Sequence, residues 1–206
     1  MTATTEPTRT TKRRAETRSR LLAAALEVLG EQGLARSSVE SVCERAGFTR
    51  GAFYSNFATM DDVVAALYEA QAEQVIDHVE ARLVDAPLAG TFEEIVAHVL
   101  HVLPVDRQWH AVRTEFTAQA LRNPEAARVV TAHRSALRQR LAPLLEAALT
   151  RAGRRLTVPA EELVRAVVTT QEGLVTPALL GDVPRQPGLE TRVIAGVLTA
   201  LTEVTR

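Results

Sequence analysis

Apolar residues recur along most of this chain at the three- and four-residue spacing of an amphipathic helix, without the alternation of a strand. The first such stretch places Leu22, Leu26 and Leu29 on one helical face, and Gly30 or Gly33 can end it. Similar stripes continue to near the end of the chain, with no convincing strand pattern between them. The pattern predicts an all-α protein of about nine helices.

Capping residues and prolines divide this pattern into separate helices. A Ser, Thr, Asp or Asn ahead of an apolar run can accept hydrogen bonds from the free N–H groups of the first turn, and proline fits that turn. Ser37 and Glu40 have the spacing of a capping box. The helices after the first are expected to begin at Ser37, Thr49, Thr59, Thr91, Asp106, Asn123, Pro159 and Pro187.

Two of these helices are short and are joined by the tripeptide Ala46-Gly47-Phe48. Such a pair is typical of a helix-turn-helix, whose second helix lies in the major groove of DNA. Burial of Phe53 and Phe57 would turn the small polar residues around them outward. The DNA-contacting residues expected from this part of the chain are Ser37, Ser38, Thr49, Arg50, Gly51, Ala52, Tyr54, Ser55 and Asn56.

Arg50 has two possible roles in such a contact. Its guanidinium matches the two acceptors on a guanine edge, but half or more of protein–DNA hydrogen bonds go to the backbone. Thr49 and Ala52 can meet a thymine methyl group, whereas the hydroxyl and amide groups of residues 54–56 suit phosphate oxygens.

Composition supports the helical interpretation and limits the alternatives. Of the 206 residues, 46% are apolar and only 4% aromatic, which favours packed helices over a sheet. A single cysteine, Cys43, excludes an internal disulfide and a zinc site built from several thiolates. Because no signal-peptide or membrane-spanning run is present, we expect a cytoplasmic protein with no membrane partner.

The charge distribution is uneven although the net charge is only −1. Residues 1–58 carry nine Lys and Arg against six Asp and Glu, and a basic cluster lies near their start. Residues 1–14 lack periodicity, so we expect a flexible basic arm. Its Lys12, Arg13 and Arg14 are candidates for contacts with DNA phosphates.

The segment from Ser37 to Leu67 resembles the DNA-binding region of the TetR family of transcriptional repressors. The likeness is strongest in the run GAFYSNF at residues 51–57, where the family has glycine, a variable residue, an apolar residue, tyrosine, two further residues and phenylalanine. The resemblance implies that Phe53 and Phe57 are core residues, that Tyr54 contacts phosphate and that residues 49–52 read bases.

The sequence departs from the family at two positions. Asn56 stands where the family often has a phosphate-contacting histidine, and its amide is an acceptable substitute. Met60 stands where the family usually has a phosphate-holding lysine at the start of the fourth helix. We hypothesise that the basic arm supplies the charge that Met60 lacks.

The resemblance also implies three regions: an arm over residues 1–14, a three-helix helix-turn-helix domain over 15–58, and a helical bundle for dimerisation and ligand binding over 59–206. In this family the last two long helices of each subunit form the dimer interface. The apolar residues expected there include Leu163, Val167, Leu174, Val193, Val197 and Leu201.

The chemically distinctive side chains of the C-terminal region are the candidates for a ligand pocket. They are His98, His101, Trp109, His110, Arg113, Phe116 and Gln171. Ordinary packing or solvent exposure is the alternative for each of them. Cys43 can likewise be a packed core thiol or a redox sensor.

Glu94, His98 and His101 share a helical face and could bind a metal, with a solvated face as the alternative. The rival classes are a helical enzyme built around this face and a protein-binding adaptor, but no Gly-rich phosphate loop or nucleophile elbow is present. We therefore expect no catalysis, metal or cofactor. The expected protein is a homodimeric repressor that binds a palindromic operator in double-stranded DNA and is released by a small-molecule effector.

Overall fold

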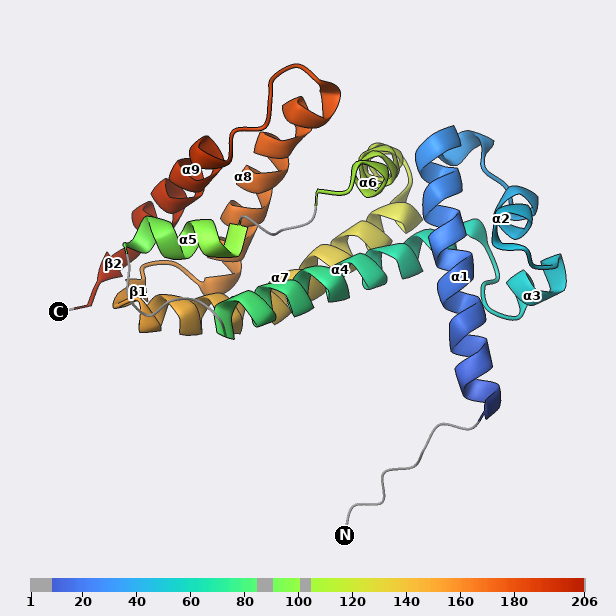
Figure 1. Cartoon of the computed structure of the whole chain (residues 1–206), viewed down its shortest axis with the longest axis horizontal. Helices are drawn as coiled ribbons and strands as arrows, with labels where there is room; N and C mark the ends of the chain where they lie inside the picture. Colours follow the sequence, from blue (N-terminus) through green and yellow to red (C-terminus); the bar gives the residue numbers. More distant parts are fainter. Residues whose placement is uncertain (1–8, 85–90, 101–104, 206) are drawn as a thin grey trace, which may run out of the picture. The chain divides into compact units, whose positions relative to one another are not determined.

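The computed structural model describes residues 9–84, 91–100 and 105–205, with side chains for 12–83, 91–97 and 105–205. These residues form nine α-helices, one 3-10 turn and two short strands, which confirms the all-α prediction (Figure 1). The elements are α1 (Arg9–Gln32), η1 (Leu34–Arg36), α2 (Val39–Ala46), α3 (Arg50–Tyr54), α4 (Met60–Val84), α5 (Phe92–Leu100), α6 (Arg107–Ala120), α7 (Pro124–Arg151), β1 (Arg154–Leu156), α8 (Ala160–Leu180), α9 (Pro187–Ala200) and β2 (Thr202–Val204).

The chain divides into two compact units. The first unit comprises residues up to 70 and residues 106–130, and the second comprises residues 71–105 and 131 onward. The first unit thus extends past the expected boundary at residue 58, because Tyr68 of α4 packs against two aromatic rings of α6. The ring centroids lie 4.8 Å apart for Trp109 and 5.9 Å apart for Phe116.

Helix α1 is the centre of the first unit, with α2 and α3 on one side of it (Figure 1). Its buried leucines and valine share one core with α2, α3, the start of α4 and α6. Helix α6 approaches α1 closely at Gly30, where an added Cβ would lie 2.8 Å from Cβ of Gln108. The Glu115 carboxylate also accepts a 2.9 Å hydrogen bond from the Leu34 backbone N–H. These contacts fix α6 to the helix-turn-helix.

Most of the expected helix starts are confirmed. Thr49, Asp106 and Asn123 each accept hydrogen bonds from the N–H groups of the following turn, and Thr59 with Asp62 forms a capping box. The prediction for α2 was wrong by one residue. Its cap is Ser38, which forms a capping box with Ser41, because the Ser37 hydroxyl instead donates to the Gly33 carbonyl at 2.7 Å.

The expected flexible arm is wrong for residues 9–14, which form the first turns of α1; residues 1–8 lie outside the described residues. Lys, Arg, Ala and Glu have high helix propensity, so a polar segment without apolar periodicity can still be helical. The Arg14 guanidinium adds a tertiary contact, because Nη2 donates a 2.9 Å hydrogen bond to the Ser55 carbonyl.

The second unit contains the pair α8 and α9, with α5 packed along α9 (Figure 1). Its two strands were not predicted. They pair antiparallel, with Arg155 opposite Glu203, and these two side chains form an ion pair. The last helix consequently ends at Ala200 and not near Val204 as expected. No helix of the described part is long and apolar enough to span a membrane.

Replacing Phe116 with alanine should destabilise the first unit. The side chain is 0% exposed, and removing a buried phenylalanine costs about 3–5 kcal/mol of the free energy of unfolding. Urea unfolding at one fixed protein concentration measures this change. The control is Leu121→Ala, because Leu121 is 82% exposed and its loss should change that free energy by less than about 0.5 kcal/mol. Equal effects of the two variants would contradict the packing.

Candidate nucleic-acid interface

Helix α3 is only five residues long, and its orientation depends on the residues at its two ends. The Thr49 hydroxyl accepts a 3.2 Å hydrogen bond from the Ala52 N–H, and Phe53 is completely buried. Phe57, just beyond the helix, is also buried. As a result five residues are exposed on one surface, as the sequence predicted, and they are Thr49, Arg50, Gly51, Tyr54 and Ser55. Ala52 is half-buried.

The turn between α2 and α3 is held in place by α1. Gly47 adopts a left-handed conformation (φ 70°) that ends α2, a geometry that disfavours residues with a side chain. The Arg20 guanidinium of α1 donates to the Ala46 carbonyl at 3.2 Å and lies 4.7 Å from the ring centroid of Phe48. The turn is therefore fixed to the helix that α2 packs against.

Arg50 begins α3 and is held on the protein surface by two groups. Its Nη1 lies 2.8 Å from Oε1 of Glu40 in α2, and its guanidinium lies 6.0 Å from the ring centroid of Tyr54. A hydrogen bond with Tyr54 and the charge of Glu40 both raise the pKa of Arg50. Arg50 thus stays cationic, and its ion pair with Glu40 competes with any contact to a base or phosphate.

Polar groups near the end of α3 are engaged within the protein. The Ser55 hydroxyl and the Asn56 Nδ2 both donate to the Ala52 carbonyl at 2.8 Å. Asn56 is half-buried, and its Oδ1 has no hydrogen-bond partner among the described residues. Tyr54 is 50% exposed, so its side chain is accessible for the expected phosphate contact.

The other expected DNA contacts differ in their accessibility. Lys12 and Arg13 are exposed on the first turns of α1. Ser37 and Ser38 are half-buried. The Ser37 hydroxyl donates to the Gly33 carbonyl, whereas the Ser38 hydroxyl caps the start of α2. Met60, in the place of the family's lysine, packs against the first unit's core.

Cys43 lies in the same core as a buried free thiol, which favours the packing interpretation. Burial raises the pKa of Cys43, and the nearby charge of Glu40 raises it further. A raised pKa lowers the fraction of reactive thiolate at neutral pH.

The expected ligand residues that the structure describes belong to both units. Phe116 and Trp109 pack in the first unit's core, while His110 and Arg113 contact each other, with Nδ1 and Nη2 3.1 Å apart. Gln171 is half-buried in α8 of the second unit. His101 and the side chain of His98 lie outside the described residues, so the predicted metal face is not described. Elsewhere in the described part, no three His, Cys, Asp or Glu side chains form a metal-binding group.

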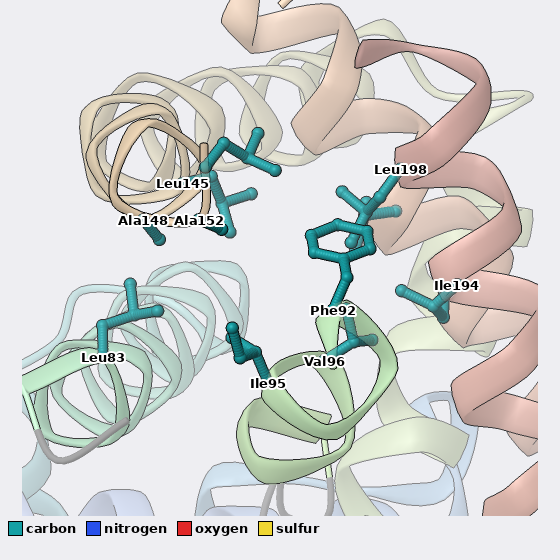
Figure 2. Close-up of a pocket in the computed structure, with 11 residues that line it drawn as sticks. Leu83, Phe92, Ile95, Val96, Leu145, Ala148, Ala152, Ile194 and Leu198 are labelled. Carbon is teal, nitrogen blue, oxygen red and sulfur yellow. The ribbon is translucent and has the colours of Figure 1, made fainter. Parts of the chain in front are cut away.

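A cavity is present within the second unit (Figure 2), and none of the five expected ligand residues with described side chains lines it. It is partly open and has a volume of about 70 Å³. The lining side chains come from α4, α5, α7, the residue after α7, α8 and α9 and are Leu83, Phe92, Ile95, Val96, Leu145, Ala148, Leu149, Ala152, Val167, Ile194 and Leu198. No local pattern in the sequence marks this set, because its members are ordinary apolar residues far apart in the chain.

The expected dimer residues fall into two groups. Leu163 is 0% exposed inside the second unit, so including it in an interface was wrong: its side chain is already enclosed by its own chain. The remaining ones, Val167, Leu174, Val193, Val197 and Leu201, are half-buried. Gly173 in α8 and Gly196 in α9 are exposed, and an added Cβ at either would meet no atom within 4 Å. These two helices therefore keep an accessible surface of small and apolar residues.

Two family models match the chain. Residues 21–67 match the model of the bacterial regulatory proteins of the tetR family. Residues 89–202, more than half of the chain, match the model of the C-terminal part of BetI-type transcriptional repressors.

Individual proteins agree with these matches. The HTH-type transcriptional regulator AcrR of Shigella flexneri is 32% identical over 96 residues, which are 45% of this chain and 44% of that protein. The chain covers 33% to 44% of the lengths of the first curated relatives that it matches.

Solved structures share the fold over most of the chain. A TetR-family regulator from Mesorhizobium loti has a TM-score of 0.70 at 18% identity, covering 91% of this chain and 96% of that one. The multidrug-binding protein EbrR in complex with ethidium has a TM-score of 0.63 at 25% identity, covering 88% and 98%.

Replacing Glu40 with glutamine should strengthen binding to duplex DNA. The change releases Arg50 from its ion pair and removes a negative charge from the surface beside α3. Exposed pairs of this kind contribute up to about 1 kcal/mol, so the affinity should rise by roughly two- to fivefold. Fluorescence anisotropy with labelled DNA at a fixed salt concentration measures the affinity.

The matched control for this variant is Glu44→Gln, on the same helix. It removes the same charge from an exposed residue and leaves the pair of Arg50 with Glu40 in place. An equal gain from both variants would show that net charge, and not the release of Arg50, sets the affinity.

Proposed function

Because the chain belongs to the TetR family of bacterial transcriptional regulators, we propose that it represses transcription by binding a palindromic operator as a homodimer and that a small-molecule effector releases it. The observation that carries the proposal is the exposed surface of α3. Thr49, Arg50 and Gly51 are presented at its start, while Phe53 anchors the other side in the core.

In this proposal α3 enters the major groove and its first residues meet the bases. Arg50 reads a base edge, and Tyr54 and Ser55 contact phosphates on either side. Lys12 and Arg13 contact the backbone from the start of α1. Arg14 supports this arrangement, because its bond to the Ser55 carbonyl ties the basic end of α1 to the end of α3. Ser37, Ser38 and Asn56 act by fixing local structure around this surface.

Dimerisation through α8 and α9 is supported by the accessible surface on these two helices. Val193 and Val197 lie one helical turn apart on α9, and both remain half-exposed in the single chain. Gly173 and Gly196 allow close approach of a second pair of helices, which would form a four-helix interface. A dimer places two recognition helices about 34 Å apart, the spacing of successive major grooves.

Release by an effector is supported by the cavity of the second unit and by the similar protein EbrR, which binds ethidium. An effector lowers operator affinity when it binds better to the conformation that does not fit DNA. A coupling of about 1–3 kcal/mol would weaken DNA binding by about 5- to 150-fold.

The test of this function is binding of the purified protein to the DNA upstream of its own gene, with unrelated DNA as competitor. We expect specific binding that weakens steeply as salt rises, because phosphate contacts release counterions. Two results together would contradict the proposal and favour a protein-binding adaptor. The protein would bind both DNAs with equal affinity at every salt concentration, and this affinity would not exceed that of an acidic control protein.

Replacing Arg50 with alanine should weaken binding to the operator by about 1–3 kcal/mol, while binding to unrelated DNA changes much less. The reason is that a base contact is lost. Arg13→Ala is the matched control: loss of a phosphate contact should weaken both DNAs alike and reduce the salt slope by about one. Competition anisotropy over a salt series measures both quantities. If Arg50→Ala lost the same affinity for the operator and for unrelated DNA, Arg50 would be assigned to a phosphate contact.

Replacing Val197 with arginine should dissociate the dimer, because it puts a charge into an apolar contact between helices. The control is Val204→Arg in β2, where the valine is already 69% exposed. Sedimentation velocity at several concentrations measures the oligomeric state. A Val197→Arg protein that stays as dimeric as the control would show that α9 does not form the interface.

A further inference from the structure

The side chains that the structure describes around the cavity of the second unit are all apolar. Each of its 11 lining residues is aliphatic or aromatic, and none carries a hydrogen-bonding or charged side chain. Figure 2 shows Leu83, Ile95 and Leu145 facing the same space from three different helices. The lining can therefore offer an occupant dispersion contacts and removal from water, but no polar side chain to recognise.

The size of this space restricts the occupant further. About 70 Å³ is roughly half of the ~150 Å³ of an engineered apolar cavity that stays dry and binds benzene or xenon. A water molecule would find no polar side chain in the lining to bind. An occupant larger than a few heavy atoms must displace a wall residue such as Phe92 or Ile95.

The two arginines beside the cavity are already bound to protein groups. Arg151 Nη2 donates to the Leu83 carbonyl at 2.6 Å, at the end of α4. Arg154 Nε donates to Thr202 Oγ1 at 2.7 Å, and its guanidinium lies 4.8 Å from the ring centroid of Phe92. An anion that approached either guanidinium would compete with these contacts.

A cation is disfavoured by the same geometry. Phe92 is the one aromatic residue of the lining, and the Arg154 guanidinium already lies over its ring. A bound organic cation would thus meet a positive charge instead of an open aromatic surface, and the described part of the lining holds no carboxylate to balance it. Only an uncharged occupant avoids both the competition for the arginines and the repulsion by Arg154.

We propose that this cavity is a binding site for a small uncharged apolar molecule, and that such molecules are the effector class of the protein. The assignment as effector rests on the proposed function, whereas the binding site itself does not. The expected site residues are thus the apolar lining of α5, α7 and α9, which includes neither His110 nor Trp109 among the described residues that the sequence suggested.

Xenon is the probe for the cavity in the intact protein. We expect xenon pressure to shift the methyl resonances of Ile95, Leu145 and Ile194 in carbon-detected NMR spectra. Ala148→Leu adds three carbons to the lining and should lower xenon affinity by roughly tenfold or more, because a packed space leaves no room. Ala147→Leu, one residue away and exposed, is the matched control and should leave the affinity unchanged.

The chemical class is tested with two probes of the same shape, neopentane and tetramethylammonium, and with pivalate as an anion. We expect neopentane to shift the same methyl resonances and the two ions to leave them unchanged at equal concentration. Shifts caused by either ion, or xenon binding that Ala148→Leu does not reduce, would overturn the proposal. If Ala148→Leu fails to fold, the spectra of the unaltered protein with neopentane and with the two ions still test the chemical class of the occupant.

Release of DNA is measured separately, by operator anisotropy at saturating neopentane. The effector assignment is supported if neopentane releases the operator from the unaltered protein and from Ala147→Leu but not from Ala148→Leu. Neopentane that occupies the cavity without changing operator affinity would overturn that assignment while leaving both the binding site and the DNA-binding function intact.

Discussion

Burial of Phe53 is the contact on which the DNA-facing surface depends. A helix of five residues is far too short to be stable alone, so α3 exists because the core holds it. The Thr49 cap, the Arg14 bond to the Ser55 carbonyl and the Arg20 bond to the Ala46 carbonyl then fix both of its ends. Exposed residues of α3 can therefore be small and polar without loss of order.

Local signals in the sequence predicted the fold, and long-range contacts account for what they missed. A cap such as Thr49 or Asp106 needs only its own next turn, so the residue type is sufficient. The choice between Ser37 and Ser38 depends on the Gly33 carbonyl before η1, and the helical start of α1 is tied to Ser55, 41 residues from Arg14. The strands pair segments about 48 residues apart through Arg154 and Thr202. None of these partners is visible in local periodicity.

The two candidate sites also differ in whether their residues are close together in the sequence. The residues proposed to face DNA lie mostly within one short segment around α3, so their spacing alone suggests a shared surface. Lining residues of the cavity come from five helices, and no single residue type marks them. Trp109 and Phe116 looked distinctive because they are large and rare in this chain, but size and aromaticity are also what a core uses to join helices. In the structure they join α6 to Tyr68 of α4.

Helix α4 contributes residues to both units. It is one continuous helix of 25 residues, in which Val63 and Leu67 are buried in the first unit's core and Leu83 lines the cavity. Its first turn follows Phe57 directly, so a shift of α4 acts on the same core that holds α3. Because the close approach of Gly30 to Gln108 leaves little space between α1 and α6, that core resists gradual deformation. An occupant that moves Leu83 would then favour a second discrete packing over a slightly distorted first one, which is the condition for a switch.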